Sequence, residues 1–93
     1  MNSTAPWQVL AEARAQKVLA RAPRPERDRL QAALDDMERD PFAGDVARPY
    51  NQLSAFRRRV GDWRIFFDVY PETRLVRVRA IERRTSTTYR QRH

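Results

Sequence analysis

Arginines recur at alternating positions in the C-terminal half of the chain, and this spacing suits the binding of phosphate. A guanidinium presents a rigid fork of N–H donors that matches two phosphate oxygens. Because successive side chains of a β-strand point to opposite faces, arginines two residues apart are expected on one side of a sheet. Aligned antiparallel strands would place six arginines on one surface: Arg57, Arg59, Arg64, Arg77, Arg79 and Arg83.

The alternative for this surface is an ordinary solvated sheet face, since antiparallel sheets commonly have one wet side. Such a face usually mixes both signs of charge, whereas Asp68 is the main acid expected among these arginines. The alignment also depends on strand register, because a one-residue slip turns every side chain to the other face. The sequence therefore predicts an anion-binding surface whose membership follows from the register.

The overall charge supports a polyanionic partner. The 93 residues include 19 Lys and Arg against 12 Asp and Glu, so the formal net charge is +7. Such a balance favours nucleic acid or a strongly acidic protein segment. The chain has no cysteine, which excludes disulfides and thiolate zinc sites and favours the cytoplasm. With one histidine and no apolar run long enough to cross a membrane, we expect no metal, no other cofactor and no membrane partner.

Two helices are predicted in the N-terminal half, after a loose tail at residues 1–6. The first, residues 11–22, has one apolar stripe at helical spacing. Proline residues then break the chain, and Pro25 suits the first turn of a second helix. Together the helices form an antiparallel hairpin over residues 11–40. The stretch around Trp7 could be a short edge strand or the entry to the first helix.

The periodicity changes to two after a polar connector, which predicts a β-meander over residues 56–84. Gly61 and Asp62 make its first turn, because glycine tolerates the positive φ that tight hairpins need. The three predicted strands are residues 56–60, residues 63–70, and a third that runs from residue 74 to residue 83 or 84.

These elements predict a single α+β domain over residues 1–93. Its small antiparallel sheet has three to four strands, and the helical hairpin packs on one face, in the order β-α-α-β-β-β. Val76, Val78 and Ala80 share the face expected to pack on the helices. Residues 85–93 form a basic C-terminal tail.

Residues 56–69 read Phe56-Arg-Arg-Arg-Val-Gly-Asp-Trp-Arg-Ile-Phe-Phe-Asp-Val69 and resemble the hallmark segment of the RelE/ParE toxin superfamily. The later Ile81-Glu-Arg-Arg84, followed by Tyr89, resembles the family's ending, and the order of the elements is similar. The resemblance implies a toxin of a type II toxin–antitoxin system. In the RelE-like branch this toxin is a metal-independent, ribosome-dependent endoribonuclease that cuts mRNA in the cytoplasm.

The resemblance also implies roles for five residues at the positions of the family's basic groups and C-terminal tyrosine: Arg57, Arg59, Arg64, Arg83 and Tyr89. Attack of a ribose 2′-OH on the adjacent phosphorus needs positive charge where the phosphorane forms, a role implied for Arg64 and Arg83. Tyr89 would transfer a proton or stack on an unpaired base. The remaining arginines of the face would bind RNA phosphate: Arg57, Arg59, Arg77 and Arg79.

One departure from the family concerns the general base. RelE has lysines where this chain has Arg57 and Arg59, and an arginine side chain stays protonated. Glu82 and His93 are the nearby side chains able to exchange a proton, and neither matches a family motif closely. The identity of the base therefore stays open.

Two other functions are compatible with this charge and family. A ParE-like protein would inhibit DNA gyrase by protein–protein binding, and an RNA-binding module would hold RNA without cutting it. The set Arg64, Arg83 and Tyr89 favours the endoribonuclease. The family implies mRNA and the ribosome as partners, together with a cognate antitoxin that covers the basic sheet face. The net charge of +7 would favour that last complex.

Overall fold

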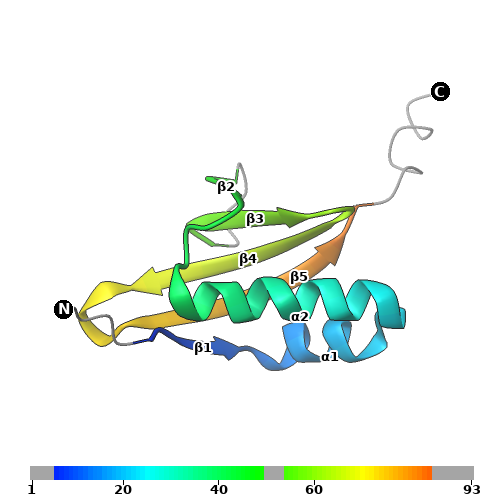
Figure 1. The fold of residues 1–93 in the computed structure, drawn as a ribbon, viewed down its shortest axis with the longest axis horizontal. Helices are drawn as coiled ribbons and strands as arrows, with labels where there is room; N and C mark the ends of the chain where they lie inside the picture. Colours follow the sequence, from blue (N-terminus) through cyan, green and yellow to red (C-terminus); the bar gives the residue numbers. More distant parts are fainter. Residues whose placement is uncertain (1–5, 50–53, 85–93) are drawn as a thin grey trace.

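The computed structural model describes residues 6–49 and 54–84. Within these ranges two α-helices pack against one five-stranded sheet (Figure 1). The predicted α+β class and helical hairpin are confirmed. The elements are β1 (Gln8–Ala11), α1 (Ala13–Arg21), α2 (Arg24–Arg39), β2 (Asp45–Ala47), β3 (Phe56–Val60), β4 (Trp63–Tyr70), a 3-10 turn (Pro71–Thr73) and β5 (Leu75–Arg83).

The sheet is larger than the predicted three- to four-stranded one. Its order is β1-β5-β4-β3-β2, so the meander lies in the middle and gains a strand at each edge. β1 pairs with β5 in parallel, which makes the sheet mixed instead of wholly antiparallel. The residues after Trp7 therefore form the edge strand, and α1 begins at Ala13 instead of residue 11. β2 was not predicted, because three residues in a polar connector are too few to show the alternation typical of a strand.

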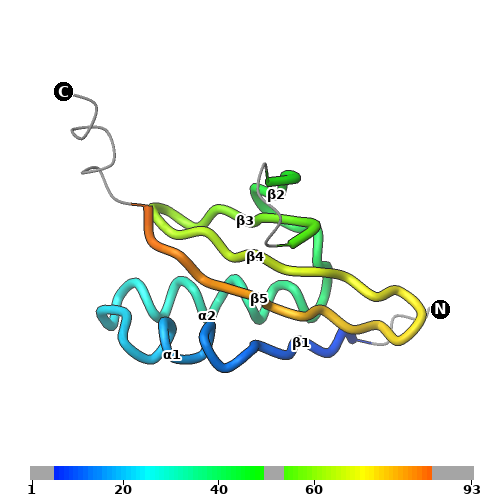
Figure 2. The backbone as a smooth tube through the Cα atoms, turned by 180° about the vertical axis from the view of Figure 1, so that it is seen from behind, coloured from blue at the N-terminus to red at the C-terminus, as the bar shows by residue number. Residues whose placement is uncertain are grey.

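Both helices cover one face of the sheet and leave the other open. From behind, the strands lie in front of the helices, with β5 and β4 crossing the middle of the view (Figure 2). The core between the two layers is formed by apolar side chains of α2 and of the central strands, chiefly Leu30, Leu34, Met37, Ile65, Phe67, Val76 and Val78. The open face is therefore the face of the sheet that is available to a partner.

The β3–β4 hairpin matches its prediction in both strands. Gly61 in the turn has a φ of +58°, a left-handed conformation that glycine adopts without a steric penalty. The turn sets the register in which Arg59 lies opposite Arg64, and Arg57 lies opposite Phe66. Side chains opposite each other in an antiparallel pair point to the same face. The hairpin thus brings three arginines together from two neighbouring strands.

A β-bulge interrupts the pairing of β4 with β5. Phe67 lies opposite Val78 and Phe66 lies opposite Ala80, so Arg79 is an extra residue on β5. An extra residue reverses the alternation of faces beyond it. The prediction that Ala80 shares the helix-facing side with Val78 is therefore wrong.

The bulge also changes the face of the last residues of β5. Glu82 lies opposite Arg64 on the open side, whereas Arg83 lies opposite the core residue Trp63 on the helix side. The prediction that Arg83 lines the same surface as Arg77 and Arg79 is wrong for this reason.

Candidate nucleic-acid interface

A row of charged residues crosses the open face near the β3–β4 turn. The strand register places one side chain from each of four adjacent strands in this row, in the order Asp45, Arg59, Arg64 and Glu82. Two cations therefore lie side by side, with a carboxylate at each end. Neighbouring like charges are unfavourable in a sheet unless an anion lies between or above them.

The next row adds one arginine and an aromatic ring. Arg57 lies opposite Phe66, which lies opposite Ala80 on the other side. Phe66 is only 2% exposed and stands apart from the core cluster between helices and sheet. The centre of the open face is thus an apolar floor with Arg57 and Arg64 beside it.

Arg57 and Arg64 have cationic groups without an anionic partner. Arg57 Nη1 and Arg64 Nε are buried and make no hydrogen bond, and neither side chain forms an ion pair within residues 6–49 and 54–84. Both guanidinium groups therefore carry a positive charge that no described carboxylate balances, and a ligand anion beside them would be favourable. Phosphate oxygens are acceptors of the required charge.

Arg59 is almost as available as these two side chains. Its Nε lies 3.9 Å from Asp45 Oδ2, and both side chains are about half exposed. A pair of this length in water contributes little, because solvent screens it and ordering two side chains has an entropic cost. Arg59 can therefore turn toward a phosphate at small cost.

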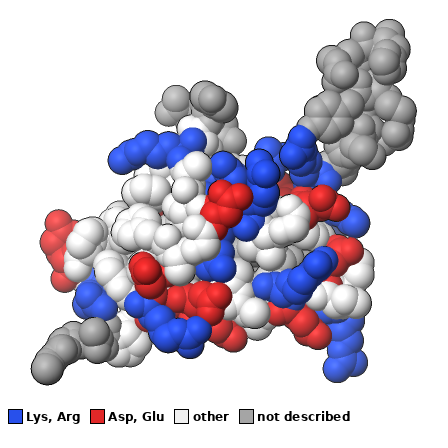
Figure 3. Space-filling view, turned by 45° about the horizontal axis from the view of Figure 1, so that its top comes forward, with Lys and Arg blue, Asp and Glu red and all other residues white. Residues whose placement is uncertain are grey.

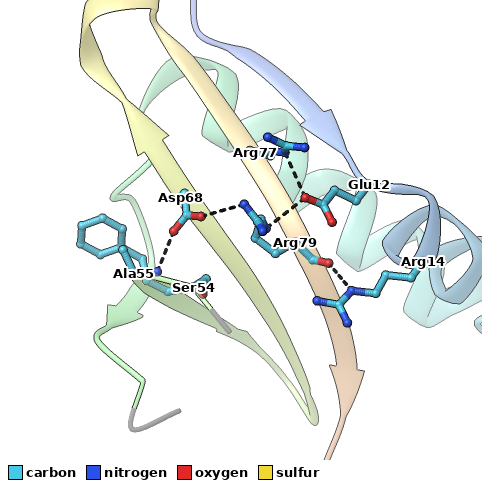
Figure 4. A network of polar contacts seen from close by, with 8 residues as sticks. Glu12, Arg14, Ser54, Ala55, Asp68, Arg77 and Arg79 are labelled. Atoms are coloured by element: carbon cyan, nitrogen blue, oxygen red, sulfur yellow. Dashed lines mark hydrogen bonds and ion pairs between the residues drawn. The ribbon is translucent and has the colours of Figure 1, made fainter. Parts of the chain in front are cut away.

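Arg77 and Arg79 are engaged by carboxylates (Figure 4). Glu12 Oε2 lies 3.0 Å from the Nε atoms of both arginines, and Asp68 Oδ2 accepts a hydrogen bond of 3.4 Å from Arg79 Nη1. Asp68 Oδ1 also accepts a bond of 2.7 Å from the backbone N–H of Ala55. The open face is therefore less one-sided than the sequence indicated, since Glu12, Asp45 and Glu82 join Asp68 among its arginines.

Arg83 is tied to α2 on the other face. Its Nη2 lies 3.6 Å from Glu26 Oε2, and its guanidinium stands 5.6 Å from the centroid of the Trp63 ring. The Trp63 indole N–H donates a hydrogen bond of 3.0 Å to Glu26 Oε1. The structure thus separates Arg64 from Arg83, which the sequence placed together.

Arg58 lies between Arg57 and Arg59 in the sequence but supports the fold on the helix side. Its side chain points to α2, donates to the carbonyl oxygen of Ala33 at 3.2 Å and lies 3.4 Å from Asp36. Acidic and basic side chains are interspersed on the side of the molecule that carries the helices (Figure 3).

Two predicted residues, Tyr89 and His93, lie outside the described residues. Within the described ranges, no group of three or more His, Cys, Asp or Glu side chains could hold a metal ion. No helix in the same ranges is long and apolar enough to cross a membrane. The acids that sequence reasoning missed, Glu12 and Asp45, carry no local signal, because only strand pairing places them on the open face.

Comparison with known proteins bears on the fold. No protein-family model matches the sequence, and no curated protein matches it. The crystal structure of the archaeal RelE–RelB complex from Pyrococcus horikoshii OT3 is similar, with a TM-score of 0.76 at 20% identity over 87% of this chain and 98% of that one. The chain has the RelE fold.

A second structure agrees with that conclusion. The toxin–antitoxin complex RelBE2 from Mycobacterium tuberculosis matches with a TM-score of 0.72 at 20% identity, over 90% of this chain and 98% of that one. The resemblance seen in residues 56–69 is thus confirmed at the level of the fold. In this RelE fold, the open face carries the unpaired arginines.

Proposed function

We propose that this protein is the toxin of a type II toxin–antitoxin system and an endoribonuclease that cuts mRNA on the ribosome. The observation that carries the proposal is the pair of guanidinium groups, Arg57 and Arg64, that form no ion pair with any described residue and lie on the open face of a RelE fold. Two structures with this fold are described as RelE–RelB and toxin–antitoxin complexes. Arg59 adds a third cation beside them.

The proposed reaction is attack of a ribose 2′-OH on the adjacent phosphorus. The new O–P bond displaces the 5′ oxygen of the next nucleotide, which takes a proton from solvent, and leaves a 2′,3′-cyclic phosphate. Arg64 would stabilise the negative charge that builds on the phosphorane oxygens, with Arg57 and Arg59 holding the scissile and flanking phosphates. No step in this scheme needs a metal ion.

Glu82 is the proposed general base. The bulge places it directly opposite Arg64, where a carboxylate could take the 2′-OH proton while the guanidinium holds the phosphate. Glu82 is exposed and makes no ion pair with any described residue, so its oxygens are open to substrate. His93 remains a second proposed proton-transfer group, on the C-terminal tail.

Arg83 and Tyr89 keep proposed roles that depend on movement or on the tail. Arg83 would have to leave Glu26 to reach a phosphate on the open face. Tyr89 would contribute a stacked ring or a proton from residues 85–93. An antitoxin is the proposed protein partner in the cytoplasm, and it would block RNA by covering the open face.

A non-catalytic function is the second candidate. The observation that favours it is the Glu26–Arg83 pair, which removes one of the two proposed charge-stabilising groups from the open face. Such a protein would bind RNA without cutting it, or would inhibit gyrase through protein contacts as ParE-like toxins do.

Primer extension on a translated mRNA tests the proposal. The wild type should cut the message, also in the presence of EDTA, and Arg64→Ala/Arg83→Ala should not. Arg27→Ala/Arg29→Ala is the matched control, because it removes two exposed arginines of α2 and should cut normally. Intact message with the wild type, or cuts that persist in the double variant, would overturn the nuclease, and DNA double-strand breaks without RNA cuts would indicate gyrase.

A further inference from the structure

The open face divides into two parts that differ in how tightly their arginines are paired. Toward β2, the side chains of Arg57, Arg59 and Arg64 are unpaired or weakly paired. Toward β1, Arg77 and Arg79 share the carboxylates of Glu12 and Asp68. The sequence assigned all five arginines to one phosphate-binding surface, so this division has consequences for RNA binding.

The Glu12–Asp68 network is tightly integrated in the fold. Glu12 lies between β1 and α1, Asp68 lies on β4, and both carboxylates are about three-quarters buried. Arg14 of α1 donates a 2.8 Å hydrogen bond to the carbonyl oxygen of Arg79, which fixes the same junction from the backbone side. Partly buried carboxylates are screened less by salt than exposed ones, so they compete effectively with a phosphate for the same guanidinium groups.

The surface next to the network is largely apolar. Leu10 of β1 is 48% exposed, and it lines a shallow hollow of about 240 Å³ together with Ala11, Glu12, Leu75 and Arg77. An RNA backbone that crossed the network would therefore meet two carboxylates and then an apolar hollow. Neither offers an arginine that is free of a carboxylate partner among the described residues.

We propose that Glu12 and Asp68 confine single-stranded RNA to the β2–β3–β4 part of the open face. The two carboxylates occupy Arg77 and Arg79 in the way that phosphates would, so these arginines hold the fold and do not bind substrate. The RNA footprint is then about three phosphates, held by Arg57, Arg59 and Arg64. This inference rests on the proposed RNA function and defines which part of the face serves it.

The salt dependence of binding counts these phosphates directly. For single strands, log K falls with log salt by about 0.7 for each phosphate neutralised, so the wild type should give a slope near −2. The probe is a short RNA with 2′-O-methyl groups throughout, which cannot be cut. Glu12→Gln/Asp68→Asn should free two arginines and steepen the slope to about −3.5. Glu12→Gln alone leaves the Asp68–Ala55 bond intact, and it should steepen the slope by about one phosphate.

Two further variants make the test specific. Asp28→Asn/Glu72→Gln removes the same charge from exposed positions away from the network and should keep the wild-type slope. Arg77→Gln/Arg79→Gln should leave the wild-type slope unchanged, but should abolish the increase when combined with Glu12→Gln.

Three results would overturn the inference. One is a steep wild-type slope that falls when Arg77 and Arg79 are replaced, and another is a folded Glu12→Gln variant with the wild-type slope. Either of these two results would contradict the proposed RNA footprint without contradicting the proposed cleavage of RNA. The third is a wild type that does not bind RNA at all, which would also overturn the proposed function.

Discussion

The arginines on the two faces of the sheet differ in what surrounds them, although they come from the same strands. On the helix side, Arg58 contacts a backbone carbonyl and a carboxylate of α2, and Arg83 contacts Glu26 and Trp63. On the open side, Arg57 and Arg64 form no ion pair with any described residue. Arg57 and Arg58 are therefore neighbours on β3 with different roles: Arg58 supports the fold, whereas Arg57 is available to a ligand.

The sharpest test of this difference compares two glutamates, one on each face. Glu82→Gln removes the proposed base and should lower the cleavage rate by about 100-fold, because a positioned proton acceptor contributes at least that much. RNA affinity should hold, since the arginines remain. Single-turnover cleavage and binding to the 2′-O-methyl RNA measure the two quantities separately.

Glu26→Gln is the counterpart on the helix side. It should lower the free energy of unfolding by about 1 kcal/mol, because Arg83 loses its carboxylate while the Trp63 bond can persist. Cleavage by the folded fraction should not become slower, because Glu26 only holds Arg83 away from the open face. If Glu26→Gln slowed cleavage as much as Glu82→Gln, the assignment of the chemistry to the open face would be wrong.

The next largest expected difference is in the free energy of unfolding, between variants of the neighbouring residues Arg57 and Arg58 on β3. Arg58→Ala should destabilise the protein by about 2 kcal/mol, because its side chain is only 11% exposed and its loss removes a donor to the Ala33 carbonyl and one of the two arginines that pair with Asp36. Arg57→Ala should change stability by less than about 0.5 kcal/mol. Urea unfolding of the two variants under identical conditions makes the comparison, and equal losses would show that Arg57 is structural as well.

The smallest expected effect concerns Arg59. Its long, exposed contact with Asp45 predicts a stability change within about 0.5 kcal/mol in Arg59→Ala. The same variant should reduce the salt slope for RNA by about 0.7, the value for one phosphate. A marked loss of stability without any change in slope would move Arg59 to the structural group.

Local patterns predicted much of this fold. The proline break separated the two helices, and Gly61 with the alternating residues around it gave β3 and β4 their observed bounds. The placement of Arg57, Arg59 and Arg64 on one face followed from that hairpin alone, because its turn fixes the register.

The remainder depends on pairing between distant segments. The bulge at Arg79 is set by packing of β4 against β5, and it transferred Glu82 to the open face and Arg83 to the helix side. Glu12 reaches Arg77 only because β1 joins β5 at the sheet edge. Neither the bulge nor the β1–β5 pairing can be predicted from hydrophobic periodicity. The open face was therefore predicted to carry fewer acidic side chains than it has.

The parallel pairing of β1 with β5 also has a consequence for how the protein acquires its shape during synthesis. The strand Gln8–Ala11 can join the sheet only after Leu75–Arg83 has been made, because the two strands pair with each other. Contacts between distant segments slow folding, because the intervening chain must lose its freedom before they form. The β3–β4 hairpin, which carries the unpaired arginines, is by contrast a local structure. The sheet that supports those arginines can therefore close only after Leu75–Arg83 has been synthesised.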